Sequence, residues 1–281
     1  MARSDWNRPS VEPVEEGYRR IRLVVSYDGS AWHGWQAQNN MPSIQEELSR
    51  ILSLITSEDI VVLGSGRTDA GVHALGQVAH FDTKSRIDAS KFAIILNSKL
   101  DKSIRIISSD EPEGIFHARF TTMAREYWYF IKRMDEALPF DDKHCSLYKR
   151  IPDIDLLNGY AECIFGTHDF TTFASARDMC ASKCRDVYVS KWDFVADMYG
   201  NKCLRYRVCG NAFLYHQVRS MVGTMMEAGL LGMSVDDFRL ILEGKDRSKA
   251  LRTAPSDGLY LARISYDENE YAWFEEANYG R

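Results

Sequence analysis

The sequence predicts an α+β protein made of two ferredoxin-like halves, each with the element order β-α-β-β-α-β. Three observations support this prediction. Apolar residues alternate with period two in short segments, they recur at helical spacing in longer segments, and the order of segments repeats along the 281 residues. Two such halves would form a central, mainly antiparallel sheet with helices, and the active-site cleft is expected between them.

The first half is expected to span residues 18–114. Its strands are predicted at residues 20–27, 60–63, 74–81 and 104–107. Ser43 and Glu46 form a capping box ahead of apolar residues that share one helical face, so a helix should begin there. A second helix is predicted from about residue 88 to residue 100.

The second half, residues 115–268, repeats this order of elements without repeating residue identities. Its predicted strands are residues 125–133, two strands around a turn at 198–202, of which the second is 203–209, and 259–265. Its predicted helices are residues 155–165, 214–231 and 235–242. A flexible tail, residues 1–17, and an acidic, aromatic tail, residues 269–281, are expected to flank the two domains.

Composition indicates a soluble, cytoplasmic protein without a membrane segment. No apolar run approaches the length of a membrane span, and the first 17 residues are polar, with Pro9 and Pro13, unlike a signal peptide. The net charge of −5 argues mildly against a nucleic-acid partner. Acidic residues gather near both ends, however, so a basic cleft on an acidic body stays possible.

Six cysteines are present, without a Cys-x-x-Cys pair. Cys180 and Cys184 are four residues apart, but no matching pair of ligands lies near them, so a zinc site is not expected. We expect free, mostly buried thiols.

The loop at residues 64–81 is the segment richest in chemical information. It reads Gly-Ser-Gly-Arg-Thr-Asp-Ala-Gly-Val-His-Ala-Leu-Gly-Gln-Val-Ala-His-Phe and follows a β-branched apolar run. Its glycines indicate a tight turn or a close approach of the backbone, with Arg67 and Asp69 at the apex. The pattern therefore predicts a strand, an exposed turn that carries a carboxylate, and a second strand.

Two common glycine loops do not fit residues 64–81. Val72 and His73 occupy the places where a phosphate-binding P-loop needs Lys and Ser or Thr, and a dinucleotide fingerprint would need glycine at Asp69. The plain alternative is that Asp69 only caps its own turn, which is the commonest role of Asp beside glycine.

The words Gly-Arg-Thr-Asp-Ala-Gly-Val-His-Ala closely resemble the catalytic loop of the TruA family of tRNA pseudouridine synthases. Further words match in family order over about residues 20–265: Tyr-Asp-Gly at 27–29, Gly-Trp-Gln at 34–36, Phe-His-Ala-Arg-Phe at 116–120 and Thr-Ala-Pro at 253–255. One departure is residues 97–104, where the family usually has Pro after the Leu and Asp before the Ile. This leaves the shape of the 101–103 loop open.

The resemblance extends to two further site residues. The Ala-Arg-x-Tyr-x-Tyr element implies that Tyr127 meets the target base, whereas Trp128 and Phe130, on the other face of the strand, are expected in the core. Residues 210–223 form a strand end, a turn and a helix start. There Arg219 resembles a basic cleft residue that contacts the catalytic Asp or a phosphate, although a surface salt bridge would also explain it.

The mechanism that the resemblance implies needs one ionised carboxylate and no metal, nucleotide or redox cofactor. Asp69 would act as nucleophile while uracil leaves its ribose, rotates and rejoins through carbon, with attack at either C1′ of the sugar or C6 of the base. Arg67 would support flipping of the base, and a nearby Arg67 or Arg219 would favour the charged carboxylate.

The resemblance implies tRNA as the partner, with uridines 38, 39 and 40 of the anticodon stem-loop as targets, and a homodimer as the active form. Several positions served by one site suggest recognition of shape and backbone. Two alternatives stay open at this point. The chain could be an RNA-binding or RNA-folding module without essential chemistry, or it could isomerise uridine in another RNA.

Overall fold

The computed structural model describes residues 10–267, which form two compact units. Unit 1 comprises the described residues up to Met123 and Leu261–Tyr266; unit 2 comprises Ala124–Tyr260 and Asp267. Residues 115–123 and most of the last strand thus group with unit 1. The expected domain bounds and tails stay a prediction, and residues 1–9 and the tail 269–281 lie outside the described residues.

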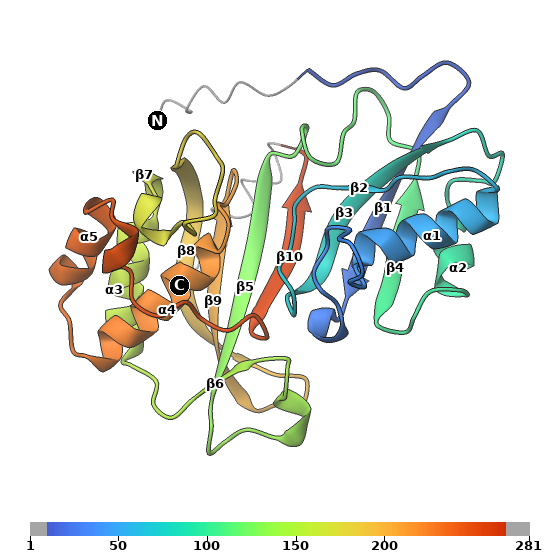
Figure 1. Ribbon diagram of the computed structural model, residues 1–281. Coiled ribbons are helices and arrows are strands. Elements are labelled where there is room, and N and C mark those ends of the chain that lie inside the picture. Colours follow the sequence, from blue (N-terminus) through green and yellow to red (C-terminus); the bar gives the residue numbers. More distant parts are fainter. Residues whose placement is uncertain (1–9, 268–281) are drawn as a thin grey trace. The chain divides into compact units, whose positions relative to one another are not determined.

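Unit 1 has the predicted order β-α-β-β-α-β (Figure 1). The elements are β1 (Arg19–Tyr27), α1 (Ile44–Thr56), β2 (Leu63–Gly64), β3 (His73–Thr83), α2 (Lys91–Asn97) and β4 (Ile104–Asp110), with a short 3-10 helix at Gly29–Ala31. The strand order is β4-β1-β3-β10, where β10 is Leu259–Ser265, and β2 pairs with β3. The pairs β1/β3, β1/β4 and β2/β3 are antiparallel, as expected.

The first strand and helix of unit 1 follow the sequence pattern closely. Alternate residues of β1 from Ile21 to Tyr27 are buried, and one face of α1 is buried. Half of the predicted capping box is present, because the Ser43 hydroxyl accepts a hydrogen bond from Glu46 N at 3.3 Å.

Of the strand predicted at residues 60–63, only Leu63 lies in a strand, the two-residue β2. Backbone N–H groups of this segment donate to side chains of α1 rather than to a neighbouring strand. Ile60 N donates to the Ser53 hydroxyl at 2.9 Å, and Val62 N donates to the Ser49 hydroxyl at 3.1 Å. A β-branched run indicates an extended backbone, but it does not reveal that helix side chains take up its hydrogen bonds.

Every helix and strand predicted for the second half is present, together with two short strands that were not predicted, β6 (Ser146–Tyr148) and β7 (Gly166–Asp169). The elements of unit 2 are β5 (Ala124–Arg133), β6, α3 (Ile154–Ile164), β7, β8 (Cys184–Ala196), β9 (Lys202–Gly210), α4 (Gln217–Leu230), α5 (Val235–Glu243) and the start of β10 (Leu259–Ser265), with 3-10 helices at Pro139–Asp141, Thr171–Phe173 and Arg247–Lys249. The strand order is β5-β9-β8-β7, antiparallel, with β6 parallel to β5. The α+β class is confirmed.

The helices of unit 2 pack as one group beside this sheet (Figure 1). Helix α3 contacts β8, α4 and α5, and the stacked rings of Tyr160 and Phe238 lie 4.8 Å apart. Helix α4 begins three residues later than predicted because His216 has a left-handed backbone, with φ of +62°. Ahead of the helix, the Leu214 N–H group donates to the side-chain oxygen of Gln217.

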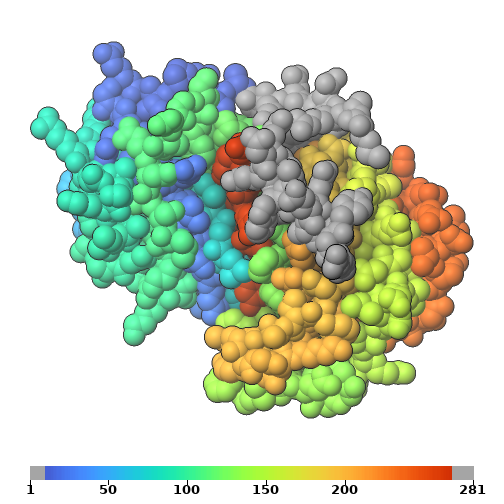
Figure 2. All heavy atoms as spheres, turned by 180° about the vertical axis from the view of Figure 1, so that it is seen from behind, coloured from blue at the N-terminus to red at the C-terminus, as the bar shows by residue number. Residues whose placement is uncertain are grey.

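A buried ion triad joins two loops at one end of unit 2. The Lys132 ammonium is 2.6 Å from Asp141 and also pairs with Asp197. Outside this triad the rings of Phe140 and Tyr199 lie 5.3 Å apart, and Figure 2 shows the residues near 200 against those near 140.

Two predictions about burial need correction. Trp128 and Phe130 are only half buried, and the guanidinium of Arg205 lies 4.9 Å from the centre of the Trp128 ring. Three of the six thiols are buried rather than most of them; Cys180 and Cys184 are exposed. Among residues 10–267 no helix is long and apolar enough to cross a membrane.

Candidate active site

The glycine loop places Arg67 and Asp69 at its apex in unit 1. Arg67 is exposed and Asp69 is half buried. The turn closes where Val72 N donates to the backbone carbonyl of Asp69 at 3.1 Å, and Gly71 has a φ of +79°. A positive φ at the third position of a tight turn favours glycine, so Gly71 is required by this backbone.

Two short motifs near the N-terminus, Tyr-Asp-Gly and Gly-Trp-Gln, form hydrogen bonds to Thr68 of this loop. The Tyr27 hydroxyl lies 2.7 Å from the Thr68 hydroxyl, and Trp35 N donates to the carbonyl of Thr68 at 3.1 Å. At Gly34 an added Cβ would lie 2.4 Å from that same carbonyl. The Gly-Trp-Gln word therefore lets the backbone at residues 34–35 approach the residue that precedes Asp69.

Trp32 holds the end of the loop and is itself held by the 101–103 turn. Gly71 N donates to the Trp32 carbonyl at 3.3 Å, and the Trp32 indole donates to the Ser103 hydroxyl at 2.9 Å. Asp101 accepts from the backbone and the hydroxyl of Ser103, which makes a compact Asx turn. The loop whose sequence departs from the family pattern is thus well formed.

The start of the loop, Ser65 and Gly66, is held by β3 and by a turn at residues 117–122. Ser65 N donates to Val78 O at 2.8 Å, and the Gln77 amide donates to Gly66 O at 2.8 Å. The Ser65 hydroxyl lies 2.7 Å from the hydroxyl of Thr122. Hydrogen bonds therefore fix the loop on both sides of its apex.

The 117–122 turn is fastened to β3 through a neutral histidine. His80 Nδ1 accepts from Ala118 N at 3.2 Å, and the rings of His80 and His117 are 4.6 Å apart. Burial, the Arg20 guanidinium and His117 together lower the pKa of His80 to about 3. Burial likewise lowers the pKa of His117. His80 therefore keeps a free lone pair for Ala118 at neutral pH.

Tyr127 lies on β5 in unit 2. It is 8% exposed, and its ring meets the Phe213 ring edge-on at 5.3 Å. Phe213 belongs to the turn that leads into α4, so Tyr127 contacts the turn within residues 210–223 in the same unit. Arg125, two residues earlier, donates to Asn211 O at 2.9 Å and ties β5 to the same turn.

Arg219 lies in the first turn of α4 and is half buried. Its Nε donates to Ala254 O at 2.9 Å, and Ala254 N donates to Arg219 O at 3.0 Å. An added Cβ at Gly223 would lie 1.9 Å from Arg252 O, so glycine allows α4 to approach this segment. The Thr-Ala-Pro word therefore orients the Arg219 side chain.

The structure thus brings Arg67 and Asp69 together on one loop of unit 1, and it places Tyr127 and Arg219 in unit 2. The bracing residues Tyr27, Trp35 and Thr122 were not predicted as site residues. The only sequence signal for the first two was that they stand in the words Tyr-Asp-Gly and Gly-Trp-Gln.

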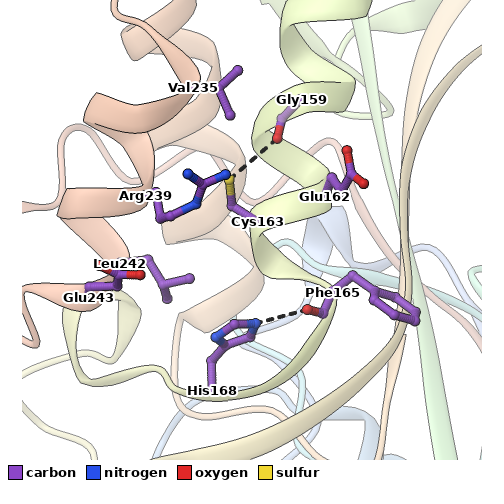
Figure 3. Close-up of a pocket in the computed structure, with 9 residues that line it drawn as sticks. All are labelled: Gly159, Glu162, Cys163, Phe165, His168, Val235, Arg239, Leu242 and Glu243. Atoms are coloured by element: carbon purple, nitrogen blue, oxygen red, sulfur yellow. Dashed lines mark hydrogen bonds between the residues drawn. The ribbon is translucent and has the colours of Figure 1, made fainter.

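A cavity of about 290 Å³ in unit 2, between α3 and α5, has none of these residues in its lining (Figure 3). Its thiol, Cys163, donates to Gly159 O at 3.5 Å, and His168 Nε2 bonds Phe165 O at 2.8 Å. Burial raises the pKa of Cys163 although Arg239 opposes the effect. A protonated thiol with a backbone partner is a poor nucleophile.

A second cavity, of about 440 Å³ in unit 1, is lined by Asp110, Glu111 and Glu113 together with Arg22, which pairs with Asp110. Its three carboxylates would repel the phosphates of a nucleic acid. The loop with Arg67 and Asp69 is therefore the better candidate for chemistry on RNA.

Comparison with known proteins decides the family. A family model described as tRNA pseudouridine synthase matches residues 23–121 and 161–267. The chain belongs to this family. It is 40% identical over 248 residues to tRNA pseudouridine synthase A of Brevibacillus brevis, covering 88% of this chain and 100% of that protein.

Two further relatives with the same name support the assignment. The protein of Bacillus subtilis is 36% identical over 258 residues, covering 88% of this chain and 99% of its own length. That of Treponema denticola is 40% identical over 263 residues, covering 91% and 96%. As a member of the pseudouridine synthase family, the chain is an isomerase of tRNA uridine, and the predicted resemblance is confirmed.

Proposed function

We propose that this synthase converts uridine to pseudouridine at positions 38, 39 and 40 of the tRNA anticodon stem-loop, with Asp69 as its only catalytic carboxylate. One observation carries the proposal: Asp69 lies on a loop whose backbone is hydrogen-bonded on both sides of the apex. A braced loop holds a reacting group in a fixed position, which is a large part of catalysis.

Asp69 is the nucleophile in this proposal, and Arg67 supports base flipping. The exposed Arg67 guanidinium is two residues from Asp69, so it can occupy the space that the flipped uridine leaves or hold a phosphate. Tyr127 would bound the uracil ring, and Arg219, oriented by Ala254, would bring a cation to the carboxylate or to RNA phosphate.

The decisive experiment measures tritium release from tRNA that carries label at uracil C5, without added metal. Wild type should release tritium, and Asp69→Asn, which is nearly isosteric but uncharged, should lower the rate at least about 10³-fold. Asp88→Asn is the matched control, because Asp88 is a turn carboxylate of unit 1 that accepts from the backbone and hydroxyl of Ser90. If Asp69→Asn keeps its turnover, Asp69 is only a turn residue.

Substrate position is tested with transcripts in which uridines 38, 39 and 40 are replaced one at a time and together. Release should persist while any target uridine remains and disappear when all are replaced. Tritium release from the fully replaced tRNA would show that the target uridine lies at another position. Binding without release by wild type would favour an RNA-binding module or a different RNA substrate.

The active form in this proposal is a homodimer in the cytoplasm. The dimer rests on the family resemblance, and the location rests on the composition of the sequence. Light scattering on the purified protein should give twice the chain mass of 32.2 kDa. A monomer that is fully active at the same concentration would contradict the dimer.

A further inference from the structure

We propose that Thr122 is a positioning residue of this enzyme, whose hydroxyl fixes the loop that carries Arg67 and Asp69. This inference rests on the proposed function and adds to it a residue from a different part of the chain. Thr122 lies beyond β4, more than fifty residues after Asp69 in the sequence.

The hydroxyl groups of Ser65 and Thr122 form a directed chain. The Thr122 hydroxyl donates to Ala118 O at 2.5 Å, which uses its single hydrogen. The Ser65 hydroxyl, 2.7 Å away, must therefore be the donor to Thr122. Ser65 is 1% exposed and Thr122 is 7% exposed, so water has little access to replace either bond.

The partner of Thr122 is itself held firmly. Ala118 is fully buried, its N–H group donates to His80 Nδ1 at 3.2 Å, and its carbonyl also accepts from the Tyr266 hydroxyl at 2.6 Å. The next residue after Thr122, Met123, donates from its backbone to Ser265 O at 2.9 Å. The 117–122 turn is therefore a fixed support for the loop.

The position of Ser65 explains why this contact bears on catalysis. Ser65 precedes Gly66, where the chain leaves the β2/β3 pairing and enters the apex. Glycine adds conformational freedom at that point. The entry to the apex is restrained by the hydrogen bonds of Ser65 with Val78 and Thr122 and by the hydrogen bond of Gly66 with Gln77.

The principal test is Thr122→Val, which keeps the shape of the side chain and removes the hydroxyl. A reacting group displaced by about 1 Å can lose about 10²-fold in rate. The single-turnover rate should fall about 10- to 100-fold, while the dissociation constant for tRNA should change less than about 3-fold. Thr122→Ser keeps the hydroxyl and should restore the rate to within about 3-fold of wild type.

A double-mutant cycle tests the contact itself. If Ser65 acts through Thr122, then the double variant Ser65→Ala/Thr122→Val should be no slower than Thr122→Val alone. Rate losses that multiply would show independent roles and contradict the proposed contact.

Thr172→Val is the matched control for loss of a buried threonine hydroxyl. The Thr172 hydroxyl donates to Ile241 O at 3.0 Å and accepts from Asp246 N at 3.1 Å, so it resembles Thr122 in burial and bonding but lies in unit 2. This variant should lower the melting temperature without lowering the rate at 25 °C. Equal rate losses in both variants would reduce Thr122 to a stability residue.

Tryptic cleavage after Arg67 gives a readout that does not depend on activity. A loosened loop exposes this bond more often, so Thr122→Val should be cut at Arg67 faster than wild type and Thr172→Val, measured by mass spectrometry. If wild type modifies no tRNA, the proposed function fails, yet the cleavage rates still decide whether Thr122 holds the loop. Unchanged cleavage in Thr122→Val would overturn the inference.

Discussion

The Tyr27 hydroxyl at the end of β1 lies 2.7 Å from the hydroxyl of Thr68, the residue directly before Asp69. Both side chains are buried, with Tyr27 at 3% exposed and Thr68 at 7%. A strand in the core of unit 1 therefore reaches the apex of the loop through one hydrogen bond. The word Tyr-Asp-Gly has its structural reason in this contact.

Tyr27→Phe should therefore reduce catalysis more than stability. The ring keeps its packing, so we expect a loss of about 1 kcal/mol in the free energy of unfolding from the missing hydrogen bond. The single-turnover rate should fall about 10-fold because Thr68 is released beside Asp69. Urea unfolding and single-turnover kinetics measure the two effects; a stability loss with an unchanged rate would remove Tyr27 from the support of the loop.

Gly34→Ala should be more damaging than Tyr27→Phe. Its φ of +88° is unfavourable for alanine, and the new Cβ would stand 2.4 Å from Thr68 O. We expect about 1–3 kcal/mol of destabilisation and a rate loss of more than about 10-fold. Gly114→Ala is the control, since Gly114 has a φ of +68° but, among the described residues, no atom within 4 Å of the added Cβ. Equal loss of activity in both variants would show that backbone strain, not displacement of Thr68, is the cause.

Much of the fold could be predicted because local patterns and tertiary structure agree. The alternation in β1 and the apolar face of α1 both point toward the core that exists. Residues 60–62 show the limit: their β-branched pattern favours a strand, but Ser49 and Ser53 of α1 take up their backbone donors. Hydrogen bonds from side chains distant in the sequence leave no periodic signal.

The candidate site, like the fold, could be predicted only in part. Glycines mark the loop that carries Arg67 and Asp69, but it is the resemblance of this loop to the family's catalytic loop that singles out the two residues. Thr122 and Gln77 could not be chosen from the sequence, since a single buried hydroxyl or amide looks like any core polar residue until its partner is known. Positions for Tyr127 and Arg219 within unit 2 follow the predicted elements, and their roles stay predictions.

His80 should make stability depend on pH below neutrality. Its pKa is about 3 in the folded protein, whereas an unfolded histidine has a pKa near 6.5. Between these values the unfolded chain binds a proton that the native state does not, so stability falls as pH is lowered from about 6.5. The cost from this one group is about 1.4 kcal/mol for each pH unit below 6.5.

His80→Asn should flatten that slope. The asparagine Oδ1 can replace Nδ1 as the acceptor for Ala118 N and does not titrate in this range. The free energy of unfolding, measured in urea from pH 7 to pH 4.5, should therefore fall less steeply in the variant than in wild type. Parallel curves for the two proteins would mean that His80 is not the group responsible.

The ion triad of Lys132 should support stability and leave the chemistry unaffected. The Lys132 side chain is 2% exposed and bonds Asp141 and Asp197. Lys132→Met leaves two carboxylates without their cation and should cost about 3–5 kcal/mol. The single-turnover rate below the melting transition should equal that of wild type, and a lower rate in the still-folded variant would connect this end of unit 2 to the reaction.

Acid titration distinguishes the charge effect of this triad from simple loss of packing. Burial tends to raise the pKa of Asp197, but hydrogen bonds from Lys132 and from the backbone of Asn201 and Tyr199 outweigh it and lower the pKa to about 2. The unfolded value is near 3.9, so the stabilisation is complete above about pH 4 and is lost as pH falls toward 2.

In Lys132→Met the largest of these hydrogen bonds is gone. The difference in unfolding free energy between wild type and Lys132→Met should therefore shrink between pH 4 and pH 2, because protonation of the carboxylates relieves the unpaired charge. A difference that stays constant over this range would assign the loss to packing of the lysine stem alone.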